Sequence, residues 1–226
     1  MTLEAVFLGM NPAGEKVYEW LNSREDVEVK ALLTEKEQLS LIKELQPEIV
    51  ISAGFEHKVP AEIIDVPEKG IVNLHPSFLP YNRGAHPYIW PIAENTVAGV
   101  SIHQMVENID EGPVIDRKEV RVEPDDTAED LYRRLMFEQF EQFKDNWDDI
   151  REGVKGEEQR LKDGNVHYRD QLNDLAEIDL DEKVKTGELI DRLRALTFPD
   201  RDVAYFESMG ERYYISIDIT PERELD

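Results

Sequence analysis

The chain has 226 residues with ordinary apolar and aromatic content, which predicts one large α/β domain or a core domain with a small appendage. It contains no cysteine, so disulfides, thiolate catalysis and cysteine-based zinc sites are excluded. Aspartate and glutamate number 50 against 26 lysines and arginines, and the resulting net charge of −24 disfavours nucleic-acid partners because phosphate backbones are repelled.

The N-terminus carries no recognisable targeting or membrane signal. The segment from Met1 to Ala5 lacks a basic stretch, and no apolar run approaches the length of a membrane helix. We therefore expect a cytoplasmic protein with no membrane partner. The acidic residues are spread along the chain, which favours a solvated surface, such as a halophilic adaptation in which salt screens the repulsion. An acidic face for a basic partner is the open alternative.

The first half of the chain alternates apolar strands with helices. The strands are expected over 5–9, 27–33, 48–52 and 70–74, and the helices over 15–22, 37–45 and 60–65. This rhythm predicts a doubly wound, mostly parallel sheet with helices on both faces. Two further strands, 97–106 and 113–122, are joined by a short loop and should pair antiparallel. A long amphipathic helix over 128–150 follows.

The remainder of the chain has a different organisation. Residues 151–174 are polar and punctuated by glycine, which is typical of a linker or an extended arm. A helix over 185–196 precedes two short strands around Met209-Gly210, a pattern that predicts a β-hairpin. We expect a catalytic domain over 1–155, a linker or arm over 156–180 and a small C-terminal α+β module over 181–226.

The turn from Gly9 to Gly14 is a weak candidate for a nucleotide-binding loop. It lacks the Gly-x-Gly-x-x-Gly spacing, and Pro12 removes an amide that would face a phosphate. A tight connection between strand and helix explains the glycines better.

The strand over 70–74 delivers two polar side chains to one place. Asn73 and His75 are two residues apart, so both lie on the same side of the strand near its carboxyl end, where α/β sheets bind ligands. A stiff, proline-rich loop with Arg83 and Gly84 follows. Asp110 is the best acidic partner, since a carboxylate beside an imidazole favours its protonated form and fixes its orientation. The alternatives are a strand cap and an ordinary turn aspartate.

Three blocks in this order resemble the folate-dependent formyltransferase family: Asn73-x-His75, then Ser77-Phe-Leu-Pro80 with Arg83-Gly84, and Ile109-Asp110-x-Gly112. The resemblance covers the expected catalytic domain and implies a Rossmann-like formyltransferase fold. It also implies that Asn73, His75 and Asp110 are catalytic, and that a formyl group moves from 10-formyltetrahydrofolate to a primary amine. The family binds folate through two loops, which correspond here to His57, Lys58 and Val59 and to Val106, Glu107, Asn108, Ile109 and Asp110. No metal is expected, because the five histidines show no ligand spacing with acidic residues.

The loop and the tail narrow the choice of amine. The tail over 189–214 resembles the segment that follows the core of nucleotide-sugar N-formyltransferases. The loop shares this resemblance, and it implies substrate contacts from Tyr81, Asn82, Arg83, His86 and Tyr88. We therefore expect a nucleotide-linked amino sugar as the acceptor. The alternatives are a methionyl-tRNA formyltransferase-like enzyme, a formyltetrahydrofolate hydrolase and a non-catalytic folate-binding protein. A homodimer could form through the C-terminal hairpin or the helix over 128–150.

Overall fold

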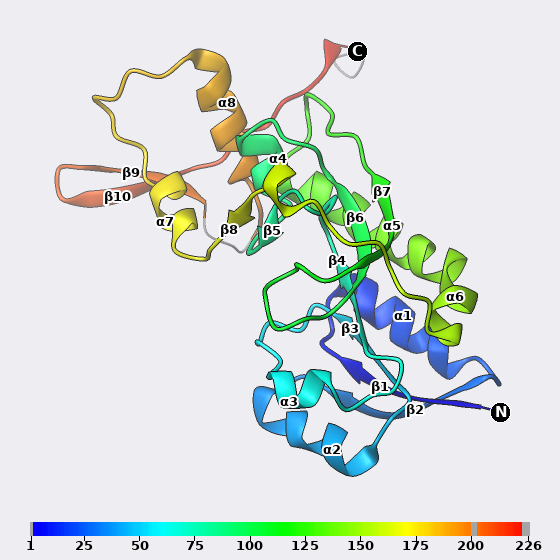
Figure 1. The fold of residues 1–226 in the computed structure, drawn as a ribbon. Coiled ribbons are helices and arrows are strands. Elements are labelled where there is room, and N and C mark those ends of the chain that lie inside the picture. The colour runs from blue at the N-terminus through cyan, green and yellow to red at the C-terminus, as the bar shows by residue number, and fades with distance from the viewer. Residues whose placement is uncertain (1, 200–202, 223–226) are drawn as a thin grey trace.

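The computed structural model describes residues 2–199 and 203–222, and a six-stranded sheet lies at its centre (Figure 1). The strands, in spatial order, are β2 (Val27–Leu33), β1 (Leu3–Leu8), β3 (Ile49–Ala53), β4 (Ile71–His75), β6 (Gly99–Gln104) and β7 (Val114–Glu119). The first four are parallel, and β6 runs antiparallel to both of its neighbours. The doubly wound, mostly parallel sheet with an antiparallel addition is confirmed.

One face of the sheet is covered by helices from two parts of the chain. These are α1 (Pro12–Asn22), α5 (Ala128–Asp145) and α6 (Trp147–Glu152). Val17 and Leu21 of α1 and Phe143 of α5 pack with Phe7 and Leu74 of the sheet in one apolar cluster. The single helix expected over 128–150 is interrupted at Asn146, which ends α5 and begins α6. The Asn146 side chain donates to Asp116 of β7 and to the Gln142 carbonyl, which fixes the break.

The opposite face is covered by helices over only part of its width. The covering elements are η1 (Lys36–Ser40), α2 (Leu41–Leu45) and α3 (Ala61–Ile64). Leu39, Ile42 and Ile63 from these elements cluster with Val6 of β1 and Val50 of β3. Over β4 and β6 the cover consists of loops instead. Because successive strand residues alternate between faces, Asn73 and His75 of β4 point toward these loops and away from α5.

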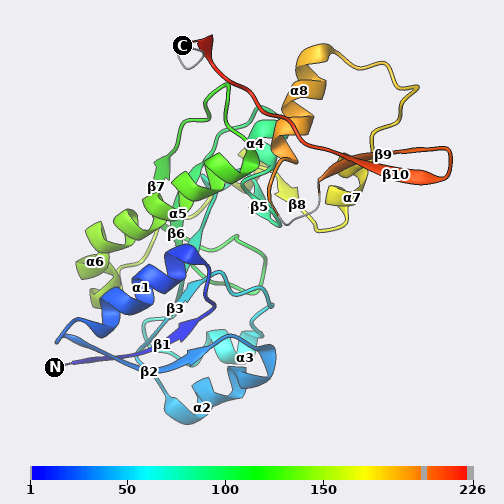
Figure 2. The ribbon, with the colours of Figure 1, turned by 180° about the vertical axis from the view of Figure 1, so that it is seen from behind.

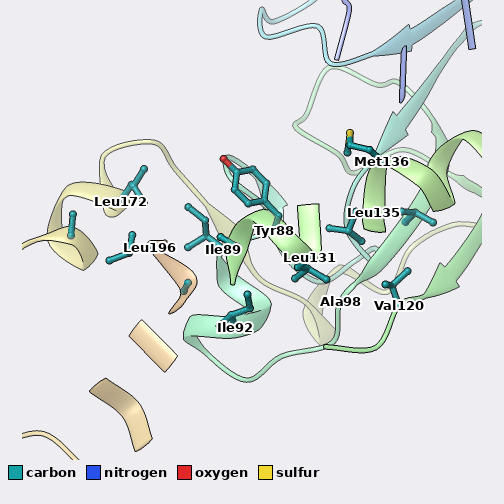
Figure 3. Close-up of a cluster of buried hydrophobic side chains, with 14 of the residues drawn as sticks. Tyr88, Ile89, Ile92, Ala98, Val120, Leu131, Leu135, Met136, Leu172 and Leu196 are labelled. Carbon is teal, nitrogen blue, oxygen red and sulfur yellow. The ribbon is translucent and has the colours of Figure 1, made fainter. Parts of the chain in front are cut away.

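The remaining elements lie in the loop after β4 and in the C-terminal part of the chain. They are β5 (Arg83–Gly84), α4 (Trp90–Ala93), η2 (Leu161–Asp163), β8 (Val166–His167), α7 (Gln171–Ala176), α8 (Thr186–Ala195), β9 (Ala204–Ser208) and β10 (Glu211–Ile215). Tyr88 and Ile92 cluster with Leu131 of α5 and with Leu172 and Leu196 from the C-terminal part (Figure 3). The C-terminal part therefore shares an apolar core with the sheet domain.

The expected β-hairpin is present as β9 and β10, and it extends away from the body of the molecule (Figures 1 and 2). The module expected over 181–226 includes 200–202 and 223–226, which lie outside the described residues. In the described part of the chain, no helix has both the length and the apolar character needed to span a bilayer.

Candidate active site

Asn73 and His75 are two residues apart on β4, so their side chains lie on the same face of the strand, as expected. Asn73 is opposite His103 and His75 is opposite Ser101 in the antiparallel pairing of β4 with β6. His75 is buried, and its Nε2 lies 3.5 Å from the carbonyl oxygen of Asn82 in the following loop. The sheet thus supplies a rigid base, and the loop closes over the imidazole.

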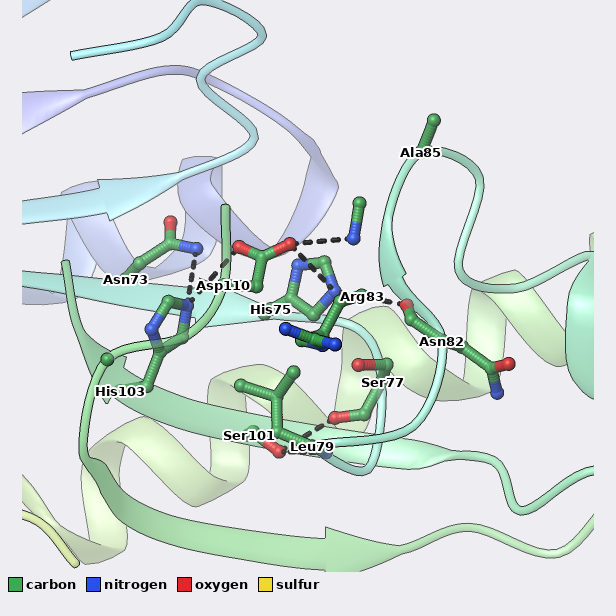
Figure 4. Close-up of polar contacts among 12 residues, drawn as sticks. Asn73, His75, Ser77, Leu79, Asn82, Arg83, Ala85, Ser101, His103 and Asp110 are labelled. Carbon is green, nitrogen blue, oxygen red and sulfur yellow. Dashed lines mark hydrogen bonds and ion pairs between the residues drawn. The ribbon is translucent and has the colours of Figure 1, made fainter. Parts of the chain in front are cut away.

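Asp110 reaches this base from the loop between β6 and β7. Its backbone is in the left-handed region, with φ of 53°, a conformation that aspartate tolerates better than most residues. The carboxylate Oδ2 accepts a 2.8 Å hydrogen bond from the Gly84 amide and lies 3.6 Å from His75 Nε2 (Figure 4). The structure therefore brings together the three predicted catalytic residues, Asn73, His75 and Asp110, from two separate segments.

Neighbouring groups stabilise the ionised form of the Asp110 carboxyl group. Burial by itself raises the pKa of this carboxyl group, but the imidazoles of His75 and His103, the Gly84 amide and Arg83 together outweigh burial. The pKa of Asp110 is consequently below its ordinary value, so the carboxylate is ionised at neutral pH. The Asp110 carboxylate, 3.6 Å from His75 Nε2, is placed to orient that imidazole.

His103 completes the cluster, and sequence reasoning did not place it there. Its Nε2 lies 3.1 Å from Asn73 Nδ2 and 3.6 Å from Asp110 Oδ1. Burial lowers the pKa of His103 to about 4, with Asp110 only partly opposing the effect. The register of β4 against β6 places His103 beside Asn73, and the sequence does not reveal that register.

A segment that we call the arm, residues 154–168, also contacts the site. Gln159 donates from Nε2 to the carbonyl oxygens of Asp110 and Gly112, at 2.8 and 2.6 Å. Asn165 accepts from the Asn82 amide at 2.6 Å, and β8 pairs in parallel with β5. A residue larger than glycine at Gly84 would collide with the His167 carbonyl. The region expected as a linker or an extended arm therefore contacts the loops that carry Asn82, Gly84 and Asp110.

The residues expected to contact the substrate differ in how deeply they are buried. Asn82 and Arg83 are buried, and Tyr88 is buried against Tyr132 and Phe198. Arg83 donates to Glu111 Oε1 at 2.8 Å, so its guanidinium already has an anionic partner. Tyr81 and His86 are half-buried. Tyr81 lines a polar cleft of about 900 Å³ between its loop, the start of β7 and the arm.

The residues expected to bind folate occupy two loops on the loop-covered side of the sheet. Val106, Glu107, Asn108 and Ile109 are all exposed, and His57 and Lys58 are also exposed, whereas Val59 is buried. Phe55, which precedes the first loop, and Met105, which precedes the second, pack against the same apolar cluster.

The turn from Gly9 to Gly14 is a tight connection between β1 and α1, as the sequence suggested. The Asn11 side chain caps α1 by accepting from the Gly14 amide at 2.7 Å, and Pro12 occupies the first turn of the helix. Gly9 has φ of 83°, and a Cβ there would lie 2.4 Å from the Phe55 amide nitrogen. The turn packs against the turn after β3 and leaves no open phosphate cradle. Among the residues described, no cluster of three or more histidines and acids is placed to hold a metal.

Two family models match this chain. Residues 18–145 match the formyl transferase model, and residues 171–221 match the N-formyltransferase dimerization C-terminal domain. The chain belongs to the formyl transferase family. The first match covers five of the six strands of the main sheet, all but β1, and the three predicted catalytic positions, and the second covers α7, α8 and the hairpin. The arm lies between the two matched regions.

Individual relatives agree with this family membership. The chain is 32% identical to the dTDP-4-amino-4,6-dideoxyglucose formyltransferase of Mycobacterium tuberculosis, over 79% of this chain and 76% of the relative. It is similar to the crystal structure of a 4-N formyltransferase from Francisella tularensis, with a TM-score of 0.86, 25% identity and coverage of 97% and 98% of the two chains. It is also similar to the formyltransferase PseJ from Anoxybacillus kamchatkensis, with a TM-score of 0.68, 27% identity and coverage of 76% and 88%. That structure contains UDP-4,6-dideoxy-4-formamido-L-AltNAc and tetrahydrofolate.

Proposed function

We propose that this formyl transferase is a sugar N-formyltransferase, which moves a formyl group from 10-formyltetrahydrofolate to the primary amine of a nucleotide-linked amino sugar. The observation that carries the proposal is the cluster of buried His75 with half-buried Asn73 and Asp110 on the loop-covered side of the sheet. The relatives support the acceptor class, because one acts on a dTDP-linked 4-amino sugar and another was crystallised with a UDP-linked 4-formamido sugar and tetrahydrofolate.

The proposed reaction is an acyl transfer between two nitrogen atoms. The amine attacks the formyl carbon, a new C–N bond forms, and negative charge develops on the formyl oxygen. An N–H of Asn73 and the protonated imidazole of His75 stabilise that oxygen, and Asp110 holds the imidazole in place. The bond between the formyl carbon and N10 then breaks. The proton lost by the amine reaches N10 through His75 or a held water molecule.

The remaining binding roles follow from the same assignment. Backbone groups of residues 57–59 and 106–110 bind the folate, and Tyr81 and His86 are the half-buried candidates for acceptor contacts. Asn82, Arg83 and Tyr88 would act on the acceptor mainly by shaping the loop, because their side chains are buried. A cytoplasmic location is part of the same proposal.

The acceptor is a small molecule rather than tRNA. A net charge of −24 opposes binding to a phosphate backbone, and the C-terminal segment matches a dimerization domain of N-formyltransferases. That match also supports a homodimer. The large acidic excess supports adaptation to high salt, where counterions screen the repulsion between carboxylates.

An assay of formyl transfer tests the proposal. The protein is incubated with 10-formyltetrahydrofolate and a panel of dTDP- and UDP-linked 3-amino and 4-amino sugars, and tetrahydrofolate formation is followed, with His75→Asn as the inactive control. Release that depends on one amino sugar would support the proposed function and identify the acceptor. Release without any amine would indicate a hydrolase, and folate binding without release would indicate a non-catalytic binding protein. Either of these two results would overturn the proposal.

A further inference from the structure

His103 is buried beside His75 and Asp110, yet the proposed reaction gives it no proton to carry. Its Nδ1 lies 3.0 Å from the carbonyl oxygen of Gln104. A carbonyl can only accept a hydrogen bond, so Nδ1 must carry the hydrogen. Burial keeps the ring neutral near pH 7 by lowering the pKa of His103 to about 4. A neutral imidazole has one N–H, and Nε2 of His103 is therefore a bare acceptor.

That acceptor determines how the Asn73 amide is turned. The neighbouring amide atom is Asn73 Nδ2, at 3.1 Å from His103 Nε2. Figure 4 shows the amide nitrogen of Asn73 toward the His103 ring and its oxygen directed away. The flipped amide would place Asn73 Oδ1 against a nitrogen lone pair and lose the hydrogen bond. Only one of the two hydrogens on Nδ2 is used by His103, so the second is free to donate.

We propose that His103 is a positioning residue that acts through Asn73: its unprotonated Nε2 fixes the amide so that an Asn73 N–H faces the reacting oxygen. This inference rests on the proposed function of the site, because it assigns Asn73 as the donor to the oxyanion. The Gln104 carbonyl sets the tautomer of His103, and His103 in turn sets the orientation of Asn73. The donor is thus aligned before the substrates bind, which is the arrangement that stabilises an oxyanion best.

The titratable groups that face His103 are Asp110 and His75. Asp110 Oδ1 is 3.6 Å from His103 Nε2, and the two imidazole rings are perpendicular, with centroids 6.2 Å apart. A proton on Nε2 would therefore turn that nitrogen into a donor toward Asp110 and displace the Asn73 N–H. The neutral tautomer keeps Asp110 available to His75.

The tautomer can be measured without any assay of activity. Long-range ¹H–¹⁵N correlations distinguish protonated from bare imidazole nitrogens, and the chain has only five histidines. The His103→Gln variant assigns the signal by its disappearance. We expect His103 of the wild-type protein at pH 7 to show a protonated Nδ1 and a bare Nε2. A protonated Nε2 would overturn the inference, whatever the enzyme transfers.

A double-mutant cycle tests whether the effect passes through Asn73. His103→Leu removes the acceptor and should lower kcat by about 10- to 100-fold, the range found when groups that orient an active-site ligand are removed. Added to Asn73→Ala, it should cause little further loss, because the amide that it orients is already gone. His103→Gln offers an amide oxygen to Asn73 and should recover part of the rate.

A destabilised strand could imitate a loss of positioning, and Val100→Ala is the control. Val100 lies on β6 but belongs to the apolar cluster that contains Leu131 and Leu135 of α5. Its effect on kcat should simply multiply with that of Asn73→Ala. If the effects of His103→Leu and Asn73→Ala also multiplied, the inference would be wrong. If Asn73→Ala alone had no effect while formyl transfer persisted, Asn73 would not be the donor and the inference would also fail.

Discussion

At the scale of single residues, the site depends on the charge of Asp110. Asp110→Asn keeps the shape and an oxygen for the Gly84 amide, but it removes the anion beside His75. We expect kcat/KM to fall by about 10²- to 10⁴-fold, the range typical of a disabled acid–base group, with the fold intact by circular dichroism. Glu107→Gln, a loss of charge at an exposed side chain of the same loop, should cost much less. Equal losses in the two variants would point to a disordered loop instead.

The buried imidazole of His103 also predicts how stability varies with pH. Its pKa is about 4 in the folded protein and 6.5 ordinarily, so the unfolded chain binds the proton first as the pH falls. The free energy of unfolding therefore decreases as the pH falls from about 6.5 to 4. At pH 5 we expect it to be about 2 kcal/mol lower than at pH 7. Asp110, whose pKa is below its usual value, adds its own loss only at lower pH.

Urea denaturation at pH 7 and pH 5 measures this loss directly. The His103→Gln variant has no titrating group at this position, and its stability should change less between the two pH values. A variant that lost as much stability as the wild-type protein would show that other groups cause the acid sensitivity.

At the scale of elements, the arm is the part of the molecule that connects the catalytic loops to the C-terminal half. Gln159→Leu removes the two hydrogen bonds to the Asp110 and Gly112 carbonyls and keeps most of the side-chain volume. We expect kcat to fall by about tenfold, because each of the two neutral hydrogen bonds contributes about 0.5–1.5 kcal/mol and both help to position Asp110. Glu158→Gln, an exposed neighbour, is the control. An unchanged kcat in Gln159→Leu would show that Asp110 holds its position without the arm.

The same scale shows how far a sequence can be interpreted. Apolar runs and turn residues predicted every strand of the main sheet, because each strand is encoded locally. The arm was expected to be a linker or an extended arm, and its contacts could not be predicted because its partners are remote, as in the hydrogen bond between Asn82 and Asn165, which are 83 residues apart. His103 was missed for a related reason: its place beside Asn73 depends on the register of two strands with the intervening chain between them. Asp110 was predicted as the acidic partner of His75 from its place in the loop between two strands, and the family resemblance then pointed to the same residue.

At the scale of the whole molecule, the net charge of −24 predicts a dependence of stability on salt. Carboxylates on a compact surface repel one another, and salt screens that repulsion over a Debye length of about 10 Å at 0.1 M and about 3 Å at 1 M. We expect the melting temperature to rise as KCl is raised from low to molar concentration. An uncharged osmolyte at equal osmolality controls for solvent effects. A melting temperature insensitive to KCl would favour an acidic face built for a basic partner.

The C-terminal hairpin predicts the mode of self-association. The chain matches a dimerization domain there, and Met209 and Tyr214 of the hairpin are highly exposed, with Tyr214 at 66%. Tyr214→Asp should therefore convert a dimer into a monomer, as measured by light scattering after gel filtration. Phe137→Asp is the matched control, because Phe137 is an aromatic residue of α5 with 52% exposure, distant in sequence from the hairpin.

The same pair of variants separates the two surfaces that the sequence suggested. A dimer lost in Phe137→Asp but retained in Tyr214→Asp would place the interface on α5. Because Asn73, His75 and Asp110 all come from one chain, the monomer made by Tyr214→Asp should retain formyl transfer when it remains folded. A folded monomer with no activity would mean that the partner subunit contributes to the site, most directly by holding the C-terminal part whose apolar residues share a core with α5.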